Sequence, residues 1–259
     1  MTAVQTLDIP SVKDQVSEQE WKLRVDLAAL YRLVALYGWE DLLFTHISIR
    51  VPGPEHHFLM NPFGLMWDEI TASSLVKIDL EGNIVMPSPY KVNKAGFTIH
   101  GGIHMSTDVH NCIIHTHSDD GVAVSTQKDG LLPITQHSMQ VIPDLAYHDF
   151  EGIALNHDER SRLVADLGDK HCMILRNHGL WTVGKTAADT FLRHFFLERS
   201  CTMQVKALAG GAEIIVPSQE TQTLVGQQGG MTKEDMKAER FSWEPLLRKL
   251  DRIDPSYRD

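Results

Sequence analysis

The sequence predicts a single α/β domain of layered helices and strands, followed by a C-terminal extension. Segments in which apolar residues repeat with helical periodicity follow segments in which they alternate, and this mixed order is typical of layered α/β domains. A chain of 259 residues can bury a large core, and neither an internal repeat nor a low-complexity linker divides it. We therefore expect a flexible tail at residues 1–16, the domain at 17–215 and the extension at 216–259.

A helix, a strand and a hairpin are expected in the first part of the domain. Ser17 and Glu20 have the spacing of a capping box and predict a helix that ends near Gly38. In the stretch "LFTHISIRV", apolar and polar residues alternate, which predicts a strand with one buried face. The stretch "SLVKIDLEGNIVM" predicts two strands joined by a turn at residues 81–83.

Helices and strands continue to follow one another in the rest of the domain. Asn93 is expected to cap a helix that contains Ile99 and carries His100 and His104 on one face. The next segments are a strand "CIIHTH", a helix at 118–128, loop and a short strand at 131–148, a helix "DERSRLVADLG", a strand pair "HCMILRNHGLWTVG" and a long helix at 185–208. Glycines between residues 210 and 230 predict a flexible region before the amphipathic segment "WEPLLRKL".

Composition and charge exclude several classes of function. The formal net charge of −10 argues against a protein that binds nucleic acid through its phosphates. No stretch approaches about 20 consecutive apolar residues, so no membrane span is expected. The N-terminus lacks the pattern of a secretory signal, and the scattered cysteines indicate buried free thiols in a reducing compartment. We therefore expect a cytoplasmic protein without nucleic-acid or membrane partners.

Two histidines separated by one residue end the apolar strand "CIIHTH". Because side chains i and i+2 point to the same face of a strand, His115 and His117 can both reach one ion at about 2.0–2.1 Å. His178 follows another buried strand and is the best candidate for a third ligand. Three histidines leave one coordination position open, which is typical of catalytic metal sites. The spacing alone does not join the three residues, so ordinary polar positions at a strand end and a turn are the alternative.

Several motifs resemble the class II aldolase/adducin family. The stretches "CIIHTHSDDGVAVS" and "LRNHGLWTVG" are similar to the family's metal-site motifs. The stretches "GWEDLLFTHISIRVPG", "HFLMNPFGLMWDEITASSLVKIDLEGNIV", "VNKAGFTIHGGIH" and "GLLPITQHSMQVIPDLAYHDFEGI" resemble its adducin-type branch. The resemblance covers roughly residues 20–210 and implies a three-layer fold, in which helices flank a central, largely antiparallel β-sheet.

The resemblance also implies a cofactor and an assembly. One divalent metal ion per subunit is expected on His115, His117 and His178; zinc is the leading ion, and iron and manganese are alternatives. The family's enzymes are commonly homotetramers with active sites at subunit interfaces, so a homotetramer that acts on a small-molecule substrate is expected here.

Two positions depart from the family's sugar-phosphate aldolases. Those enzymes carry an acidic residue, typically glutamate, about 19 positions before the first metal-binding histidine, and Gly96 occupies that position here. The family's phosphate-binding Gly-Asn is replaced by Thr45–His46. A phosphorylated sugar is therefore not the expected substrate.

Other residues are candidates for the missing acid/base and for substrate binding. Histidine suits proton transfer near pH 7, and the acid/base candidates are His100, His104, His137 and Asp119. The substrate-binding candidates are His46, Ser73 and Ser74, whereas Glu69 is expected to cap or orient the segment that follows it. For each of the acid/base candidates, the alternative is a polar group satisfied by the backbone or by solvent.

Three functions are compatible with these observations. The leading one is a metal-dependent lyase that cleaves a C–C bond of a small hydroxy or oxo acid, by aldol cleavage or decarboxylation, through a metal-stabilised enolate. The first alternative is an adducin-like oligomerising scaffold without activity. The second is a non-haem iron oxygenase, because imidazole ligands suit zinc, iron and copper alike.

Overall fold

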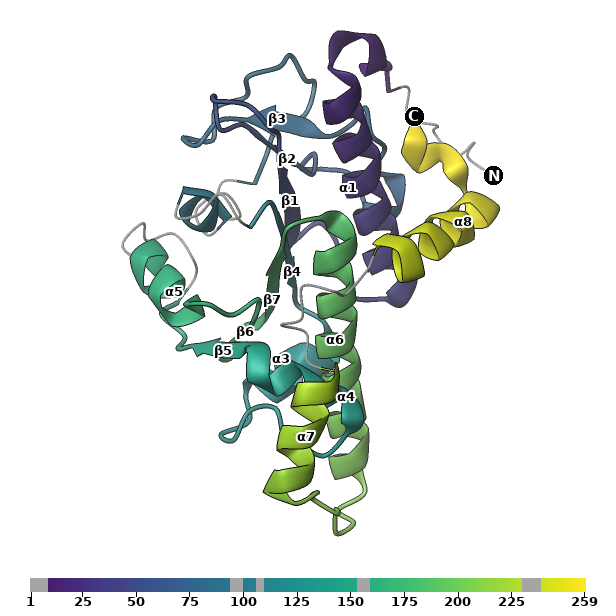
Figure 1. The fold of residues 1–259 in the computed structure, drawn as a ribbon. Coiled ribbons are helices and arrows are strands. Elements are labelled where there is room, and N and C mark those ends of the chain that lie inside the picture. The colour runs from purple at the N-terminus through teal and green to yellow at the C-terminus, as the bar shows by residue number, and fades with distance from the viewer. Residues whose placement is uncertain (1–8, 94–99, 106–109, 153–158, 230–238) are drawn as a thin grey trace, which may run out of the picture.

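A seven-stranded sheet forms the centre of the protein (Figure 1). The computed structural model describes residues 9–93, 100–105, 110–152, 159–229 and 239–259. Strand order is β3-β2-β1-β4-β7-β6-β5, and neighbours are antiparallel except the parallel β5–β6 pair. The strands are β1 (His46–Arg50), β2 (Phe58–Met60), β3 (Val76–Ile78), β4 (Cys112–Thr116), β5 (Leu145–His148), β6 (Cys172–Leu175) and β7 (Gly179–Gly184). The predicted α/β fold with a largely antiparallel sheet is confirmed.

Helices cover both faces of this sheet (Figure 1). The long helices α1 (Glu18–Tyr37) and α6 (Ala187–Ala209) lie on one face, and α5 (Glu159–Leu167) lies on the other. The remaining helices are α3 (Asp119–Ser125) and α4 (Gln136–Val141), which pack on α6, α7 (Gln219–Gly229), which packs on α4, and α8 (Glu244–Ile253), which packs on α1. The three layers of the expected fold are therefore present.

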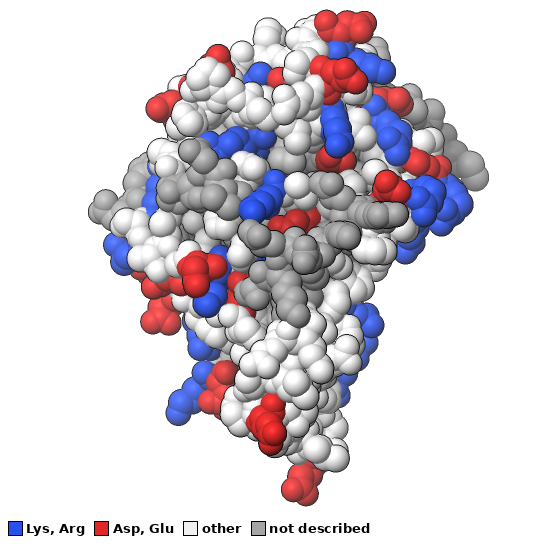
Figure 2. All heavy atoms as spheres, viewed as in Figure 1, with Lys and Arg blue, Asp and Glu red and all other residues white. Residues whose placement is uncertain are grey.

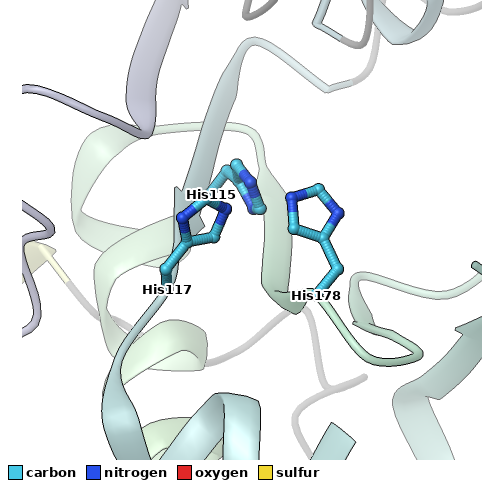
Figure 3. Close-up of side chains that lie close together, drawn as sticks. All are labelled: His115, His117 and His178. Carbon is cyan, nitrogen blue, oxygen red and sulfur yellow. The ribbon is translucent and has the colours of Figure 1, made fainter. Parts of the chain in front are cut away.

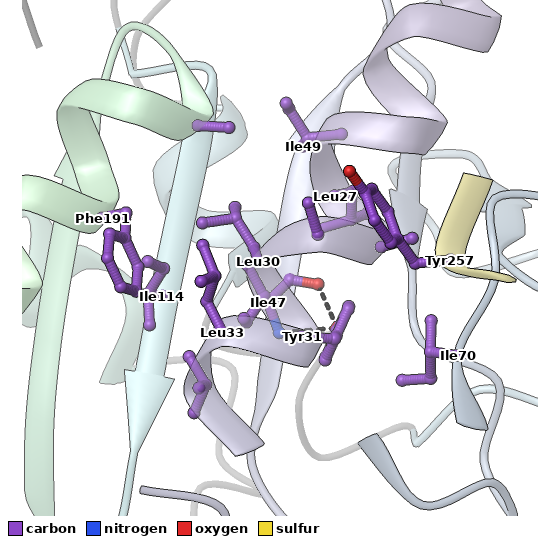
Figure 4. Packing of buried hydrophobic residues seen from close by; sticks show 14 of the residues in the cluster. Leu27, Leu30, Tyr31, Leu33, Ile47, Ile49, Ile70, Ile114, Phe191 and Tyr257 are labelled. Atoms are coloured by element: carbon purple, nitrogen blue, oxygen red, sulfur yellow. Dashed lines mark hydrogen bonds between the residues drawn. The ribbon is translucent and has the colours of Figure 1, made fainter. Parts of the chain in front are cut away.

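Alternate residues of the strands enter two separate cores. Ile47, Ile49 and Ile114 point towards α1 and α6, where Phe191 joins the cluster drawn in Figure 4. Residues of the opposite face, such as Ile113 and Trp181, pack with Leu163 and Leu167 of α5. Both faces of the central strands are consequently buried.

Burial of both faces corrects the prediction that β1 has only one buried face. His46 and Ser48, on the polar side of the strand, are 5% and 0% exposed. The helical segment at residues 100–105 covers them, and Ser48 Oγ lies 2.7 Å from His100 Nδ1 and 2.8 Å from His104 Nε2. Polar alternation thus identified the strand correctly, but here the polar face meets other polar side chains instead of solvent.

The ends of α1 match the prediction at both termini. The Ser17 hydroxyl accepts a hydrogen bond from the Glu20 N–H at 3.1 Å, and Gly38 ends the helix with a φ of +69°. A capping box also requires the Glu20 side chain to accept from the Ser17 backbone N–H. That bond is absent, because the Glu20 carboxylate instead bonds Arg24 Nε at 3.0 Å and Lys77 Nζ at 2.8 Å. Glu20 therefore ties the helix to β3.

Three further predictions are corrected by the structure. The hairpin after residue 74 is reduced to β3 and an isolated bridge between Ile78 and Ile84. Residues 131–148 contain α4 as well as β5, because Thr135 caps a helix there. The glycine-rich segment contains α7, whose Gly229 lies so close to α4 that a Cβ would be 2.3 Å from the Gln140 side chain. This part of the segment is therefore a helix that packs on α4.

The other elements follow their sequence patterns. The strand pair β6–β7 and helices α3, α5, α6 and α8 lie where they were expected, and all three cysteines are free and buried. Asn93 was expected to cap a helix that contains Ile99. Residues 94–99 lie outside the described part of the chain, so this prediction is not tested. Within the described part of the chain, no helix is long and apolar enough to cross a membrane.

Both ends of the described chain contact the domain. The Val12 N–H donates to Ser73 Oγ at 3.3 Å, and the Ser73 N–H donates to the Asp259 carbonyl at 2.8 Å. Tyr257 is 0% exposed and belongs to the core under α1. The domain boundaries at residues 16 and 215 remain a prediction, since these contacts do not define them.

Acidic and basic side chains are interspersed over the face shown in Figure 2. Among the described residues on that face, no broad area carries basic side chains alone. This distribution is consistent with the formal net charge of −10.

Replacing Tyr31 with phenylalanine is expected to lower the free energy of unfolding by about 1–3 kcal/mol. The buried hydroxyl donates to the Ile47 carbonyl at 2.5 Å and accepts from the Ile47 N–H at 2.7 Å (Figure 4). Its loss leaves buried backbone groups of β1 without a partner. Urea unfolding measures the change, and Tyr37→Phe, which removes a hydroxyl from the same helix, is the control. Equal stability of the two variants would contradict the prediction.

Candidate metal centre

Three histidines meet at the end of β4 and the turn between β6 and β7 (Figure 3). His115 is on β4, His117 follows that strand, and His178 is in the turn. One nitrogen of each ring lies within 4.8 Å of the corresponding nitrogens of the other two. The ring centroids are 4.7 to 4.9 Å apart in all three pairs. The structure therefore brings together the three residues that the sequence predicted as metal ligands.

The turn that carries His178 has a conformation set by its neighbours. Asn177 has a φ of +57°, a left-handed conformation that asparagine tolerates better than most residues. A Cβ on Gly179 would lie 2.3 Å from the Thr116 carbonyl oxygen, so only glycine allows β7 to approach β4 this closely. Asn177 and Gly179 thus hold His178 beside the end of β4.

Hydrogen bonds orient two of the three rings. His115 Nδ1 lies 2.9 Å from the Leu180 carbonyl oxygen, and His117 Nδ1 lies 3.1 Å from Asp41 Oδ2. Because these oxygens only accept, each Nδ1 carries an N–H, so Nε2 is the nitrogen through which each ring, when neutral, can bind a metal. His117 Nε2 is buried and has no hydrogen-bond partner among the described residues. Rings held in this way by a carbonyl and a carboxylate fit a metal ion.

Burial keeps two of these imidazoles neutral, the form that binds metals. It lowers the pKa of His115 well below the usual histidine value, and the neighbouring His178 lowers it further. Burial also lowers the pKa of His178 to about 4, with His117 as the next cause. A neutral ring can donate its lone pair near pH 7 without first losing a proton.

Glu198 of α6 fixes the chain on both sides of His117. The Thr116 hydroxyl donates to its Oε1 at 2.7 Å, and the Ser118 hydroxyl donates to its Oε2 at 2.6 Å. Glu198 and its neighbour His194 are 0% exposed. Sequence reasoning missed Glu198; the available signal was a His and a Glu four residues apart in the run "HFFLE" of α6.

Replacing Asp41 with alanine is expected to weaken metal binding about 10- to 100-fold. The carboxylate that orients His117 would be lost, although the three ligating rings would remain. Competition with a fluorescent zinc chelator measures the affinity. Glu40→Ala, one residue earlier, is the control for a lost negative charge. An unchanged dissociation constant for Asp41→Ala would show that the carboxylate does not support the ligand.

His46 and His100 lie next to the triad, and His104 lies further away. The His46 ring is 5.5 Å from that of His115 and 4.2 Å from that of His100. Both nitrogens of His46 are buried and lack a hydrogen-bond partner among the described residues. Burial lowers the pKa of His46 to about 3 and that of His100 well below its usual value. Gly96 lies outside the described residues.

The other candidates lie in different surroundings. His137 is on α4 with its ring 5.0 Å from Phe196, and Asp119 is exposed in the first turn of α3. The Ser74 hydroxyl donates to the Thr71 carbonyl at 2.9 Å. Glu69 Oε2 accepts from the Met66 N–H at 2.8 Å and so caps a short 3-10 turn, as expected. Within the described chain, none of these contacts reaches the triad, so the acid/base and substrate-binding roles of His137, Asp119 and Ser74 stay predictions.

Comparisons with known proteins agree with this architecture. A family model described as "Class II Aldolase and Adducin N-terminal domain" matches residues 25–205. A provisionally named class 2 aldolase protein of Caulobacter vibrioides is 56% identical over 250 residues, which are 96% of each chain. The structure of an L-fuculose 1-phosphate aldolase from Glaciozyma antarctica PI12 shares 27% identity at a TM-score of 0.81, and the match covers 98% of this chain and 97% of that one.

Adducins are also similar to this chain. Mouse alpha-adducin is 39% identical over 245 residues. The match covers 89% of this chain but 33% of the adducin, so the similarity concerns one part of that larger protein.

Proposed function

Because the chain belongs to the class II aldolase and adducin family, we propose that it is a metal-dependent lyase. It would cleave a C–C bond of a small hydroxy or oxo acid, by aldol cleavage or decarboxylation. The observation that carries the proposal is the set of three converging imidazoles, since three protein ligands leave a coordination position for a substrate oxygen. The similarity to an L-fuculose 1-phosphate aldolase over nearly the whole chain supports C–C bond chemistry.

The proposed cofactor is one divalent metal ion per subunit, held by His115, His117 and His178. Zinc is our first choice because three neutral imidazoles are a common catalytic zinc set, and iron or manganese are alternatives. A metal ion at this position supplies Lewis-acid polarisation of a carbonyl oxygen. The protein's own contribution is the burial that keeps His115 and His178 neutral, together with the Leu180 carbonyl and Asp41, which orient His115 and His117.

The proposed substrate is an acid without a phosphate group. Thr45–His46 occupies the position of the family's phosphate-binding Gly-Asn, and the buried His46 ring adds no fixed positive charge near pH 7, since its pKa is lowered to about 3. Ser73 is bonded to the backbone of Val12, which leaves it less available to a ligand. A carboxylate or carbonyl oxygen can instead reach the metal directly.

We further propose a cytoplasmic homotetramer. Apolar side chains lie exposed near the triad, with Leu42 61%, Phe44 52% and Phe150 53% exposed. The Phe150 ring is 6.4 Å from that of His178, and Phe44 pairs with the Asp41 that orients His117. A second subunit at this edge would remove apolar surface from water.

Two other functions stay open to test. The similarity to alpha-adducin supports an oligomerising scaffold without activity. The all-imidazole ligand set supports a non-haem iron oxygenase, because iron also accepts such ligands.

Metal analysis and a cleavage assay on the purified protein distinguish the three functions. For the lyase, we expect about one zinc, manganese or iron ion per subunit and cleavage of 4-hydroxy-2-oxo acids, which a chelator abolishes and added metal restores. Pyruvate release coupled to lactate dehydrogenase reports aldol cleavage, and carbon dioxide release reports decarboxylation. Protein without metal would support the scaffold, and iron with oxygen uptake would support the oxygenase. Either result would overturn the lyase.

A further inference from the structure

A fourth histidine near the triad has features of a proton-transfer group. His148 ends β5 and is 5% exposed. Its Nδ1 lies 2.7 Å from Asp166 Oδ2 of α5, and because a carboxylate only accepts, this nitrogen carries the N–H. Nε2 is buried and has no hydrogen-bond partner among the described residues. The ring is therefore fixed in orientation, and Nε2 faces the carboxylates of Glu159 and Glu151 without a hydrogen bond to either.

His148 lines the same cavity as one member of the triad. This cavity is small, about 10 Å³, and His148, Phe150, Glu159 and His178 are among the residues that surround it. The strand pairing explains this position, since His148 is opposite Leu175 in the parallel β5–β6 pair and the chain reaches His178 three residues later. A substrate at the open side of the triad and beside Phe150 would therefore lie close to His148.

The candidates from the sequence lack this combination of features. His100 and His104 both bond the hydroxyl of Ser48, and the structure shows no carboxylate, among the residues it describes, that orients either ring. His137 stacks on α6 through Phe196, and the exposed Asp119 is in the first turn of α3. Neither of these two lines the cavity that His148 and His178 share.

We propose that His148 is the acid/base residue of this site and that Asp166 is the positioning residue that holds it. The inference rests on the proposed lyase function, which requires a group that moves a proton. Gly96 has no side chain at the position where the family's aldolases carry their carboxylate. An imidazole oriented by a carboxylate through Nδ1 is an established arrangement for proton transfer at Nε2.

The proton moves twice in an aldol cleavage. Nε2 accepts the proton of the substrate hydroxyl, and the electron pair of that O–H bond forms the carbonyl of the departing aldehyde. The electron pair of the broken C–C bond becomes the enolate of the remaining oxo acid. His148 then returns the proton to the enolate carbon, so the product gains one hydrogen and the ring is neutral again.

Charged side chains around the ring favour this cycle. Glu159 Oε1 and Glu151 Oε1 lie 3.6 and 3.9 Å from Nε2, and Asp166 lies on the other side. Arg162 pairs with Glu151 and reduces its charge. The remaining negative charge stabilises the ring while it holds the transferred proton.

Deuterium exchange at the methyl group of pyruvate in D2O isolates the proton transfer from bond cleavage. The metal-loaded protein is expected to catalyse this exchange, and His148→Gln is expected to slow it about 100- to 10,000-fold. Metal content and the affinity for oxalate, an enolate mimic, are expected to stay unchanged. Asp166→Asn is expected to slow exchange while metal content and oxalate affinity stay unchanged, because the ring loses the carboxylate that orients it.

His171→Gln is the matched control. His171 is another aspartate-paired histidine, with Nδ1 3.0 Å from Asp144 Oδ1, and it does not line the cavity. Exchange at the wild-type rate in His148→Gln would overturn the assignment and leave the lyase standing. Loss of metal or oxalate binding in that variant would indicate a structural role and would also overturn it. Metal-loaded wild-type protein that catalyses neither exchange nor cleavage would overturn the lyase, and the assignment with it.

Discussion

Replacing both His115 and His117 with alanine is expected to remove the bound metal while the protein stays folded. Two of the three nitrogens that lie within 4.8 Å of one another would be lost, and the single imidazole of His178 cannot hold a divalent ion tightly by itself. The fold is expected to persist because β4 keeps its pairing with β1 and β7 and its apolar residues Ile113 and Ile114.

Elemental analysis and far-UV circular dichroism test this double variant. Metal content is expected to fall from about one ion per subunit to a trace, with an unchanged spectrum. His56→Ala with His57→Ala is the matched control, because it removes two adjacent histidines from a loop outside the triad. Full retention of metal by the His115 and His117 variant would refute the site.

Replacing Glu198 with alanine is expected to lower the free energy of unfolding by about 3–5 kcal/mol. The carboxylate is fully buried and accepts bonds from the Thr116 and Ser118 hydroxyls, and His194 Nε2 lies 3.3 Å from it. Its removal leaves these polar groups buried without a partner, at about 1–3 kcal/mol for each one that stays unpaired. It also releases the chain on both sides of His117, so metal affinity should fall as well.

Urea unfolding and chelator competition measure these two effects of Glu198. Glu198→Gln keeps the side-chain shape and one acceptor oxygen and is expected to lose less stability than the alanine variant. Glu220→Ala on α7 is the matched control, because it truncates a glutamate that is exposed at the start of a helix and should change stability by less than about 0.5 kcal/mol. A Glu198→Ala protein as stable as Glu220→Ala would contradict the role of Glu198.

Much of the fold was predictable because its patterns are local. The alternation in residues 46–50 and the run before His115 identified β1 and β4, and Ser17 and Gly38 marked both ends of α1. The errors arose where a local pattern had two meanings. The glycines between residues 210 and 230 indicated flexibility, but Gln219–Gly229 forms α7, which packs on α4. The polar face of β1 indicated solvent, but His100 and His104 cover it.

The sequence by itself determined the family and most of the strands, and it pointed to the three histidines through the resemblance of their motifs to those of that family. Only the tertiary structure decided which groups support them. Asp41 lies 76 residues from His117 in sequence, Glu198 lies 82 residues from Thr116, and Asp166 reaches His148 from a different element. Such contacts depend on how helices pack on the sheet, and packing is a property of the whole core rather than of any short stretch.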